Sequence, residues 1–229
     1  LPAHVLLGLP KTTINEICSP NSTILLIGSD LKEEYGTLYI RLRDAITNMG
    51  AKLIELTPIE TGLSNIASIS LRPRPGEIAK VVNSILTGEA PVEIGGISKE
   101  SIKACHELIQ DTQINVVFAH HSIAESTEPI TQALTLLREV NETKFLPLVK
   151  RANTIGALHM GMAPGQLPGQ ISLHDHNKSG LIGWPNLPED EGMTTDQILE
   201  SAANGEIDVL FLLGTCLLYT SPSPRDYPG

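Results

Sequence analysis

Two pairs of histidines have the types and spacing best suited to metal or acid–base chemistry. His120 and His121 directly follow the apolar run INVVFA, and catalytic groups of α/β folds often lie at such strand ends. Adjacent residues at a strand end point in different directions, however, and no acidic partner is placed for either side chain. His174 and His176 have the i, i+2 spacing with which a strand could aim two ligands at one ion, but no third ligand lies nearby. We therefore expect no metal site at either pair.

Motifs for nucleophilic catalysis and phosphate binding are also missing. Ser122 and Ser126 lack the GxSxG elbow that exposes a catalytic serine. Gly28-Ser29-Asp30 lacks both the GxGxxG and the GxxxxGK[ST] patterns that cradle phosphates. Cys105 falls on the apolar stripe of an expected helix, where a thiol is usually a small hydrophobic group. The spacing of these residues therefore predicts no catalytic residue and no metal ligand.

The stretch from Ile24 to Pro58 predicts a strand, a helix and a second strand. ILLIG at its start is a β-branched apolar run too short for a helix. Apolar residues then recur at i, i+3, i+4 and i+7 from Tyr35 to Met49, as in an amphipathic helix, and AKLIELTP follows as a buried strand. Such a unit requires a parallel sheet, whose ligands lie beyond the carboxyl ends of its strands. Gly28-Ser29-Asp30 and Thr57-Pro58 are therefore at the expected binding edge.

The rest of the chain predicts a second α/β unit, with a boundary near Asp111. Residues 1–111 form the first unit with its entry segment, and residues 112–215 form the second, which contains a Gly/Pro-rich coil at 144–192. The fold class is therefore α/β, with two parallel-sheet units. The further elements expected are a short strand at Ser70, helices from Glu77 to Gly88 and after Ser98, a strand at 114–120, a helix from Thr127, a helix with a capping box at Thr194 and Gln197, and a strand from Val209 to Leu213.

The composition excludes several classes of protein. With a formal charge of −10, and only three Phe and one Trp in 229 residues, the chain lacks the basic patches and stacking rings of a nucleic-acid binder. No apolar run approaches the length of a membrane span and no leader peptide opens the chain, so we expect neither membrane insertion nor secretion. Cys18, Cys105 and Cys216 form no CxxC pair, which excludes a local iron–sulphur or zinc knuckle and suits a reducing compartment.

The two ends of the sequence are atypical of a complete domain. The chain begins at Leu1 in a segment typical of the middle of a domain, and CLLYTSPSPRD at 216–226 follows an apolar run abruptly. That peptide resembles one reading frame of a transposon adapter used in sequencing libraries. We therefore interpret residues 216–229 as a scar of sequencing and the remainder as an internal fragment of a longer protein.

Three stretches carry a resemblance to the molybdopterin-oxidoreductase family. ILLIGSDLKEEYGTLYIRLRDAITNMGAKLIELTP resembles the family's strand ending in Gly-Ser-Asn, its helix and its Gly-Ala-Lys strand ending in Asp-Pro. NTIGALHMGMAPGQLPG resembles its Asn, Gly-Ala, Met-Gly and Pro-Gly block, and ILESAANGEIDVLFLLG resembles its helix, Gly-Glu-Ile and strand unit. Within the family, DLKEEYGTLYIRLR, LHMGMAPGQLPG and Arg74–Glu77 are most similar to the G subunit of bacterial NADH-quinone oxidoreductases, the large iron–sulphur subunit of respiratory complex I. The resemblance covers nearly all of residues 5–215 and implies a Rossmann-like fold.

The positions that bind the pterin cofactor in active members of the family differ here. By resemblance, Thr57 stands where an Asp binds a nucleotide ribose, and Asp30 replaces the Asn of Gly-Ser-Asn. Glu77-Ile78 replace a Thr-Asp pair whose Asp reaches the pterin. Together with Gly28 and Ser29, these positions are expected to be a vestigial cofactor site. Several unmade hydrogen bonds of about 1–3 kcal/mol each would remove the affinity for a polar cofactor.

The resemblance implies that the chain is an internal, scaffolding part of that large subunit, whose complex transfers electrons from NADH to quinone. No cofactor is expected in this fragment, because the iron–sulphur clusters are held by cysteines in the N-terminal part of the parent subunit. The implied partners are the other subunits of the complex I peripheral arm. The implied location is the cytoplasmic side of the bacterial inner membrane.

Two alternative interpretations stay open at this point. The chain could be a fragment of a catalytic molybdopterin oxidoreductase, such as a formate dehydrogenase, whose active-site Cys or selenocysteine lies upstream of Leu1. Thr57 and Ile78 count against this alternative, because they replace cofactor-binding carboxylates. The chain could also be an unattached α/β protein with a histidine metal site.

Overall fold

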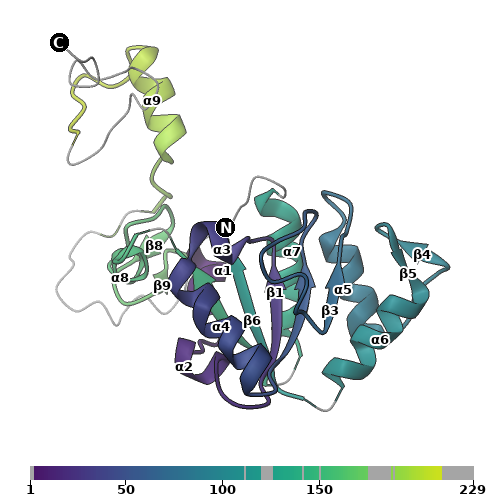
Figure 1. Ribbon diagram of the computed structural model, residues 1–229. Coiled ribbons are helices and arrows are strands. Elements are labelled where there is room, and N and C mark those ends of the chain that lie inside the picture. The colour runs from purple at the N-terminus through teal and green to yellow at the C-terminus, as the bar shows by residue number, and fades with distance from the viewer. Residues whose placement is uncertain are drawn as a thin grey trace, which may run out of the picture.

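The fold is built around one five-stranded parallel β-sheet. In the described residues the sheet has the strand order β3-β2-β1-β6-β7, with helices on both faces (Figure 1). Every strand pairing in it is parallel, so the predicted α/β fold class is confirmed. This computed structural model describes residues 3–110, 112–119, 126–140, 142–149, 151–174, 187 and 189–212. The strands are β1 (Thr23–Ile27), β2 (Lys52–Leu56), β3 (Ile69–Leu71), β6 (Ile114–Ala119) and β7 (Lys144–Leu148).

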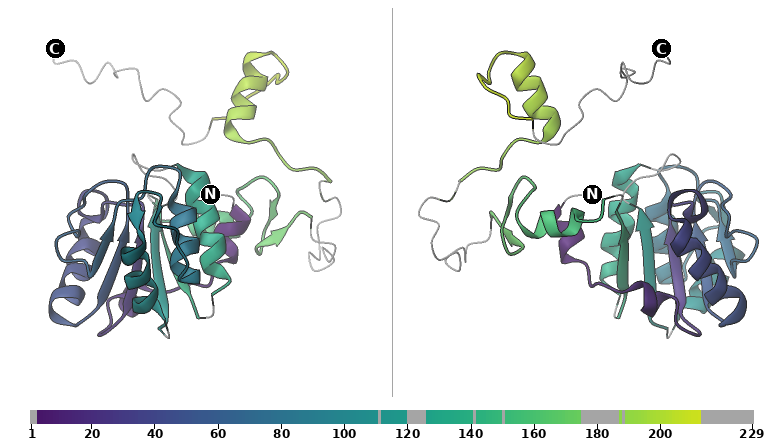
Figure 2. Two further views of the ribbon diagram at one scale, coloured as in Figure 1. Left: turned by 90° about the vertical axis from the view of Figure 1, so that its right-hand side faces the viewer. Right: turned by 60° about the vertical axis from the view of Figure 1, so that its left-hand side comes forward.

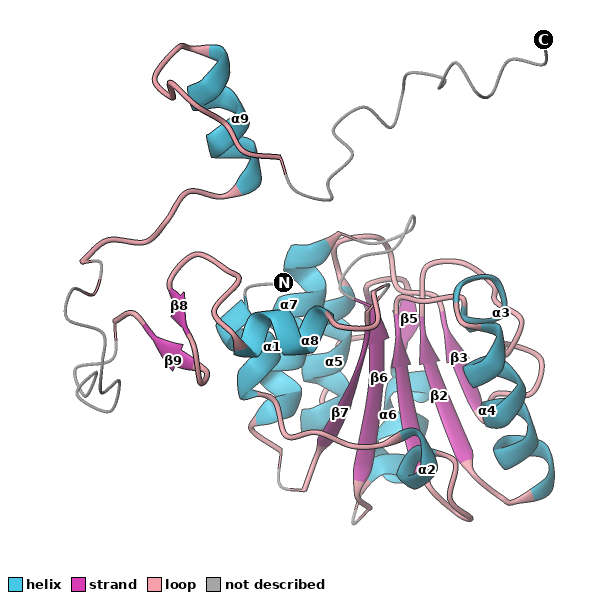
Figure 3. Ribbon diagram, turned by 90° about the vertical axis from the view of Figure 1, so that its left-hand side faces the viewer, coloured by secondary structure: helices cyan, strands magenta, loops and turns pink. Residues whose placement is uncertain are grey.

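Strand β1 is buried along its whole length because both faces of the sheet are covered. All five of its residues are buried, and its side chains alternate between two apolar clusters. Ile24 and Leu26 share one cluster with helix α4, whereas Leu25 and Ile27 share the other with α5, α6 and α7. Figure 3 shows α4 on one side of the sheet and these three helices on the other. Burial on both faces explains why residues 24–27 of β1 are a continuous apolar run. The four helices are α4 (Gly36–Asn48), α5 (Ile78–Thr87), α6 (Lys99–Ile109) and α7 (Thr127–Arg138).

The helices begin and end at residues that the sequence singles out. Helix α5 is closed by Gly88, which takes the left-handed conformation with a φ of 71°. Ser98 caps α6 with its side-chain oxygen. Thr194 and Gln197 form the predicted capping box of α9 (Thr195–Ala203). The helices predicted around these residues are therefore confirmed.

Shorter elements surround the sheet. Helix α2 is held against β7 by an ion pair between Glu16 Oε1 and Lys144 Nζ at 3.0 Å. The hydrogen bond from Lys144, together with those from Thr13, lowers the pKa of the Glu16 carboxyl to about 2. Figure 2 shows α9 standing apart from the sheet and its covering helices. The remaining elements are α1 (Ala3–Gly8), α2 (Ile14–Ile17), α3 (Leu31–Glu34), α8 (Thr154–His159) and the antiparallel pairs β4 (Glu93–Ile94) with β5 (Ile97–Ser98) and β8 (Gln166–Leu167) with β9 (Ile171–Ser172).

The prediction of two separate parallel-sheet units, 1–111 and 112–215, is wrong. Strand β6 lies directly beside β1, with register pairs from Thr23 opposite Ile114 to Ile27 opposite Phe118. Strands from both ranges therefore belong to one sheet and share its core. Parallel strands pair across long connections, so the periodicity of a sequence does not reveal which strands become neighbours.

Two local predictions in the C-terminal half are also wrong. Residues 144–148 form β7 rather than coil, and α8 and the β8–β9 hairpin interrupt the coil predicted for 144–192. Pro147 is tolerated in β7 because this strand lies at the edge of the sheet, where a missing N–H breaks no ladder. Residues 209–212 of the predicted strand Val209–Leu213 form no strand, and their exposed fractions range from 39% to 91%. Asp111, where a domain boundary was predicted, and Leu213 lie outside the described residues. Residues 216–229, interpreted as a scar of sequencing, also lie outside them.

The thiol of Cys105 offers a test of this core. It is fully buried in the cluster shared with α5 and α7, and burial raises its pKa from the ordinary 9.0 to about 12. Between these two values the unfolded chain releases the thiol proton and the folded chain keeps it, so this group's stabilisation is complete below pH 9 and is lost as pH rises. We expect urea unfolding to show a steeper loss of stability between pH 9 and pH 11 for the natural sequence than for Cys105→Ala. We also expect Cys105 to resist iodoacetamide in the folded chain at neutral pH. Equal pH slopes, or rapid labelling, would contradict this burial.

Candidate site at the carboxyl edge of the sheet

The strand order places a topological switch point between β1 and β6. Strands β2 and β3 follow on one side of β1, whereas β6 and β7 follow on the other. Ligands of parallel α/β sheets usually lie beyond the carboxyl ends of the strands at such a point. Gly28, Ser29 and Asp30 follow β1 here, and Thr57 follows β2, as the sequence predicts. His120, His121 and Ser122 come after β6 in the sequence but lie outside the described residues.

Gly28 and Ser29 are buried where β1 ends. Gly28 has a φ of 69°, and its N–H donates to the carbonyl of Leu56 at 3.0 Å, which ties the end of β1 to β2. The Ser29 side chain is fully buried, and its Oγ has no hydrogen-bond partner in the described part of the chain. A buried hydroxyl without a partner costs about 1–3 kcal/mol. Ser29 is therefore a polar group of this edge that keeps unused hydrogen-bonding capacity.

The carboxylate of Asp30 is engaged with the backbone. Its Oδ1 accepts hydrogen bonds from the N–H of Lys32 at 3.0 Å, as the N-cap of α3, and from the N–H of Gly62 at 3.4 Å. Gly62 lies in the loop between β2 and β3, so Asp30 connects the end of β1 with that loop. An ionised carboxylate is an acceptor only. Asp30 thus adds negative charge to the edge without offering a donor to an anion.

Thr57, Glu77 and Ile78 have different surroundings. Thr57 is 1% exposed at the end of β2. Ile78 is fully buried in the apolar cluster of α5 to α7, so its side chain packs in the core. The Oε1 atom of Glu77 forms an ion pair with Lys80 Nζ at 3.0 Å, and its Oε2 atom lies 4.0 Å from Arg74 Nη1. The side chains of Glu77 and Ile78 are therefore engaged elsewhere than at the carboxyl edge.

A buried carboxylate with several partners lies close to Thr57. Glu55, the penultimate residue of β2, is fully buried. It accepts hydrogen bonds from the hydroxyls of Thr61, Ser64 at 2.7 Å and Ser70 at 2.5 Å. Its Oε2 atom also lies 3.3 Å from Arg72 Nη1, and Arg72 Nη2 donates to Ser64 Oγ at 2.7 Å. These five residues are termed the Glu55 cluster below. A buried charge is tolerated only when it is paired and hydrogen-bonded, and the cluster meets both conditions.

Sequence reasoning did not identify the Glu55 cluster. The available signal was a single charged residue inside the apolar strand KLIEL, followed by several hydroxyl-bearing residues. The partners are set by the register that places Glu55 opposite Ser70 of β3 and by the fold of the loop between the two strands. Neither feature can be read from spacing alone. The cluster fixes that loop to β2. Its polar groups bind one another at this part of the edge.

The other predicted candidates are not assembled into a metal site. Nε2 of His174 lies 2.8 Å from Oε1 of Glu191, and both side chains are exposed, whereas His176 is not described. In the ranges that the structure describes, no group of three or more His, Cys, Asp or Glu side chains could hold a metal ion. Cys18 and Cys105 are buried free thiols, and Cys216 lies outside those ranges. The alternative of a histidine metal site therefore has no support from the described residues.

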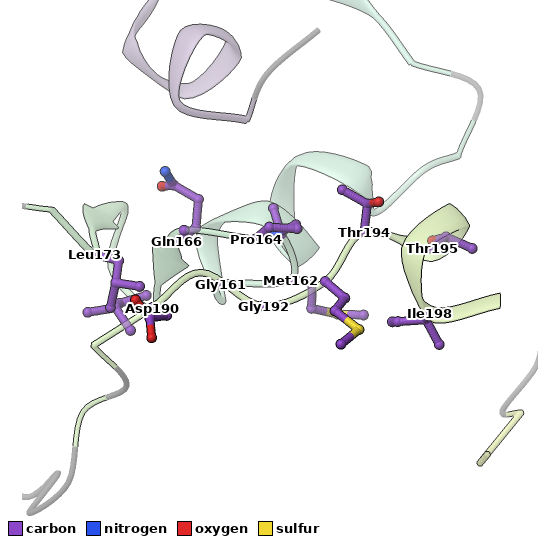
Figure 4. Close-up of a pocket in the computed structure, with 14 residues that line it drawn as sticks. Gly161, Met162, Pro164, Gln166, Leu173, Asp190, Gly192, Thr194, Thr195 and Ile198 are labelled. Atoms are coloured by element: carbon purple, nitrogen blue, oxygen red, sulfur yellow. The ribbon is translucent and has the colours of Figure 1, made fainter. Parts of the chain in front are cut away.

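A cavity of about 500 Å³ lies away from the carboxyl edge. It separates the segment 161–167 from the start of α9, and Figure 4 shows Met162, Pro164 and Ile198 along it. Asp190 is the one charged residue among the described residues that line it. None of the site residues expected from the sequence lines this cavity. Its described lining also includes the polar side chains of Gln166, Thr194 and Thr195.

A solved structure and several curated proteins are similar to this chain. No family model matches the sequence. The G subunit of the NADH-quinone oxidoreductase of Streptomyces coelicolor is 26% identical over 196 residues, covering 83% of this chain and 22% of that protein. The NADH-quinone oxidoreductase G subunit numbered 2 of Rhizobium meliloti is 25% identical over 225 residues, covering 87% and 26%. The alpha subunit of the NADPH-Fe(3+) oxidoreductase of Geobacter sulfurreducens is 23% identical over 246 residues, covering 89% and 28%.

Among solved structures, a chain of the formyltransferase/hydrolase complex of Methylorubrum extorquens, in complex with methylofuran, has the same fold. The TM-score is 0.55 at 16% identity, covering 97% of this chain and 59% of that one. The five-stranded parallel sheet is consistent with a Rossmann-like part of a molybdopterin-oxidoreductase fold.

Over most of its length the chain is therefore similar to subunits of oxidoreductases. The predicted resemblance to the G subunit of NADH-quinone oxidoreductases is confirmed by curated relatives with that name. The chain spans about a quarter of the length of the curated relatives it matches.

Removing the Glu55 carboxylate tests how much the cluster contributes to the free energy of unfolding. Glu55→Ala removes the carboxylate that pairs with Arg72 and accepts from three hydroxyls, and breaking a buried ion pair from one side typically costs about 3–5 kcal/mol. We expect the free energy of unfolding to fall by about 3 kcal/mol, at the low end of that range because the Arg72 side chain is 33% exposed. Urea unfolding followed by circular dichroism measures this change.

Glu93→Ala is the matched control, since it breaks the exposed pair between Glu93 and Arg74, whose atoms are 2.8 Å apart. Exposed pairs contribute about 0–1 kcal/mol, so the control should remain near the natural stability. Equal losses for the two variants would contradict the assignment of Glu55 as a buried, paired charge.

Proposed function

We propose that the chain is part of the large iron–sulphur subunit of a bacterial NADH:quinone oxidoreductase, whose complex transfers electrons from NADH to quinone. The observation that carries this proposal is the similarity to two proteins named as G subunits of NADH-quinone oxidoreductases, over 83% and 87% of the chain. Because the chain spans about a quarter of these relatives, the activity belongs to the longer protein and its complex.

The role of this part of the subunit is structural. Its body is a sheet with apolar clusters on both faces, and the described side chains form no group that could hold a metal ion. Iron–sulphur clusters need sets of cysteine thiolates. Cys18 and Cys105 lie in the clusters on opposite faces of the sheet, and burial raises the pKa of both thiols. The iron–sulphur clusters are accordingly assigned to cysteines in the N-terminal part of the parent subunit.

The carboxyl edge has lost molybdopterin binding. A pterin nucleotide is a polar, anionic group whose buried atoms need partners, above all donors for its phosphates. Three observations support the loss. Asp30 is an acceptor engaged with backbone N–H groups, Ile78 is buried in the core, and Thr57 offers a single hydroxyl in place of a bidentate carboxylate. The residues present at this edge therefore do not fit the cofactor, although Ser29 retains a free hydroxyl.

The proposed partners are the other subunits of the complex I peripheral arm, on the cytoplasmic side of the bacterial inner membrane. The names of the relatives, which are subunits of oxidoreductases, support partnership with other subunits of such a complex. Within the described ranges, every helix is too short or too polar to cross a membrane.

A second candidate differs in the electron donor and acceptor. The similarity to a protein named as the alpha subunit of an NADPH-Fe(3+) oxidoreductase covers 89% of the chain at 23% identity. On this alternative, the chain is part of a subunit of an enzyme that reduces ferric iron with NADPH. The structural role of this fold would be the same. The choice of donor and acceptor distinguishes the two candidates directly.

Substitutions in the full-length subunit, assayed in the purified complex, test the structural role. Ser29→Ala and Thr57→Val remove the hydroxyls of the carboxyl edge, and we expect NADH:quinone turnover per assembled complex to stay within about twofold of the natural value because they touch no substrate. Leu42→Ala opens a cavity in the fully buried core. It should cost about 2–5 kcal/mol and lower the amount of assembled complex instead.

Loss of turnover in a fully assembled complex would contradict the structural role. A general acid or base contributes about 100-fold or more, so a loss of that size in the Ser29 or Thr57 variant would overturn the structural role. Turnover with NADPH and ferric iron, but not with NADH and a quinone, would replace the first candidate with the second.

A further inference from the structure

The cavity of about 500 Å³ beside α9 combines buried and exposed apolar side chains. Leu167 and Leu173 line it and are only 4% and 3% exposed. Met162 and Met193 line it as well, but they are 74% and 52% exposed. Methionine is enriched at protein–protein interfaces, since its flexible thioether adapts to the shape of a partner. The cavity therefore offers an adaptable apolar surface to another molecule.

The residues that line this cavity lie in a row. In Figure 4 they extend from Leu173 and Asp190, past Met162, to Ile198 of α9. The volume lies within the range of about 300–1,000 Å³ that is usual for binding sites. A row of apolar side chains can receive successive side chains from one face of a helix, as in grooves that bind amphipathic helices. The cavity with its lining is termed the α9 groove below.

The chain around the α9 groove is strongly acidic. Residues 189–208 contain seven carboxylates, and no Lys or Arg occurs in 152–174, 187 or 189–212. All seven residues are exposed. Among the described residues, Glu191 alone has a side-chain partner, Nε2 of His174 at 2.8 Å. The seven acidic residues are Glu189, Asp190, Glu191, Asp196, Glu200, Glu206 and Asp208.

Part of this acidic run lies at the α9 groove itself. Asp190 lines the groove, and Oε1 of Glu191 lies so close to Gly165, another lining residue, that a Cβ atom there would clash with it. A run of like charges on its own is usually only solvated surface. Exposed apolar surface with a polar rim, in contrast, marks a site of interaction. The α9 groove has both the apolar surface and the rim.

We propose that the α9 groove binds a basic amphipathic segment of another subunit of the complex. Apolar side chains of that segment lie against Met162 and Met193. Its Lys or Arg side chains pair with Glu189, Asp190 and Glu191. The presence of other subunits rests on the proposed function.

The charge of the rim selects among the possible occupants. Carboxylates without neighbouring cations repel the phosphates of nucleic acids and of anionic lipid surfaces. Surface that is buried within one folded chain seldom carries charges, whereas a subunit interface has an apolar centre and a polar rim. Opposite charges across such an interface speed association and fix the choice of partner. A cationic segment of a separate polypeptide therefore fits the α9 groove.

Oxidation of the two methionines measures whether the α9 groove is occupied. Hydrogen peroxide converts exposed thioethers to sulfoxides, which mass spectrometry quantifies at each position. We expect Met162 and Met193 to be oxidised at least about tenfold more slowly in the purified complex than in the isolated full-length subunit. Equal rates in the two samples overturn the proposal, because the groove is then either open in both or covered by the same polypeptide in both.

Charge reversal tests the nature of the partner. Glu189→Lys with Asp190→Lys places like charges against a basic segment, and we expect both methionines in the complex to be oxidised within about twofold of the rate in the isolated subunit. Glu107→Lys with Glu139→Lys is the matched control, since it makes the same change of charge at exposed residues of α6 and at the end of α7. The control should keep the protection. Equal protection in the two double variants overturns the proposal, and if the first fails to assemble, the rates in the natural complex decide.

Failure of this proposal can be distinguished from failure of the proposed function. Unprotected methionines in a complex that oxidises NADH with a quinone overturn only the binding at the α9 groove. Protected methionines in a complex that reduces ferric iron with NADPH, but does not reduce a quinone with NADH, overturn only the proposed function.

Discussion

The burial of one carboxylate in a sheet that is apolar on both faces is the constraint on which the carboxyl edge depends. Strand β1 is buried along its whole length, and β2 is buried from Leu53 to Leu56, so Glu55 has no access to water. An isolated carboxylate there would cost several kcal/mol, about the whole stability of a small domain. Three hydroxyls and Arg72 surround it, and together they fix the loop between β2 and β3. Asp30 ties the end of β1 to the same loop through Gly62.

This arrangement links the fold to the proposed role. At this edge, where parallel α/β proteins usually bind a ligand, the carboxylates of Asp30 and Glu55 are already engaged in hydrogen bonds within the chain. Asp30 caps a helix, the residues of the Glu55 cluster bind one another, and Ile78 packs in the core. Such a body holds its neighbours in position and performs no chemistry itself. This is what the proposed structural part of a large electron-transfer subunit requires. The similarity to subunits of oxidoreductases over most of the chain supports a place in an oxidoreductase complex.

The features that could be predicted from the sequence are those encoded locally. The apolar run of β1, the stripe of α4, the left-handed Gly88 and the capping box at Thr194 all depend on residues a few positions apart. The errors depend on distant residues. Strand β6 joins β1 across a long connection, and Pro147 is compatible with a strand only because β7 lies at an edge. The Glu55 cluster needs the register between β2 and β3, and the predicted strand at 209–212 pairs with none of the described strands. Gly28, Ser29, Asp30 and Thr57 follow the ends of β1 and β2 as expected, but the hydrogen bond between Asp30 and the loop after β2 could not be predicted.

We propose that this fold serves an oxidoreductase complex without holding a molybdopterin cofactor. The most direct test is elemental analysis of the complex purified with the full-length subunit, with molybdenum, tungsten and iron measured per polypeptide by mass spectrometry. The account predicts that iron is retained and that molybdenum and tungsten are far below one atom per polypeptide. One atom of molybdenum or tungsten per polypeptide would contradict it, and would mean that the carboxyl edge rearranges to bind the cofactor that its described residues do not fit.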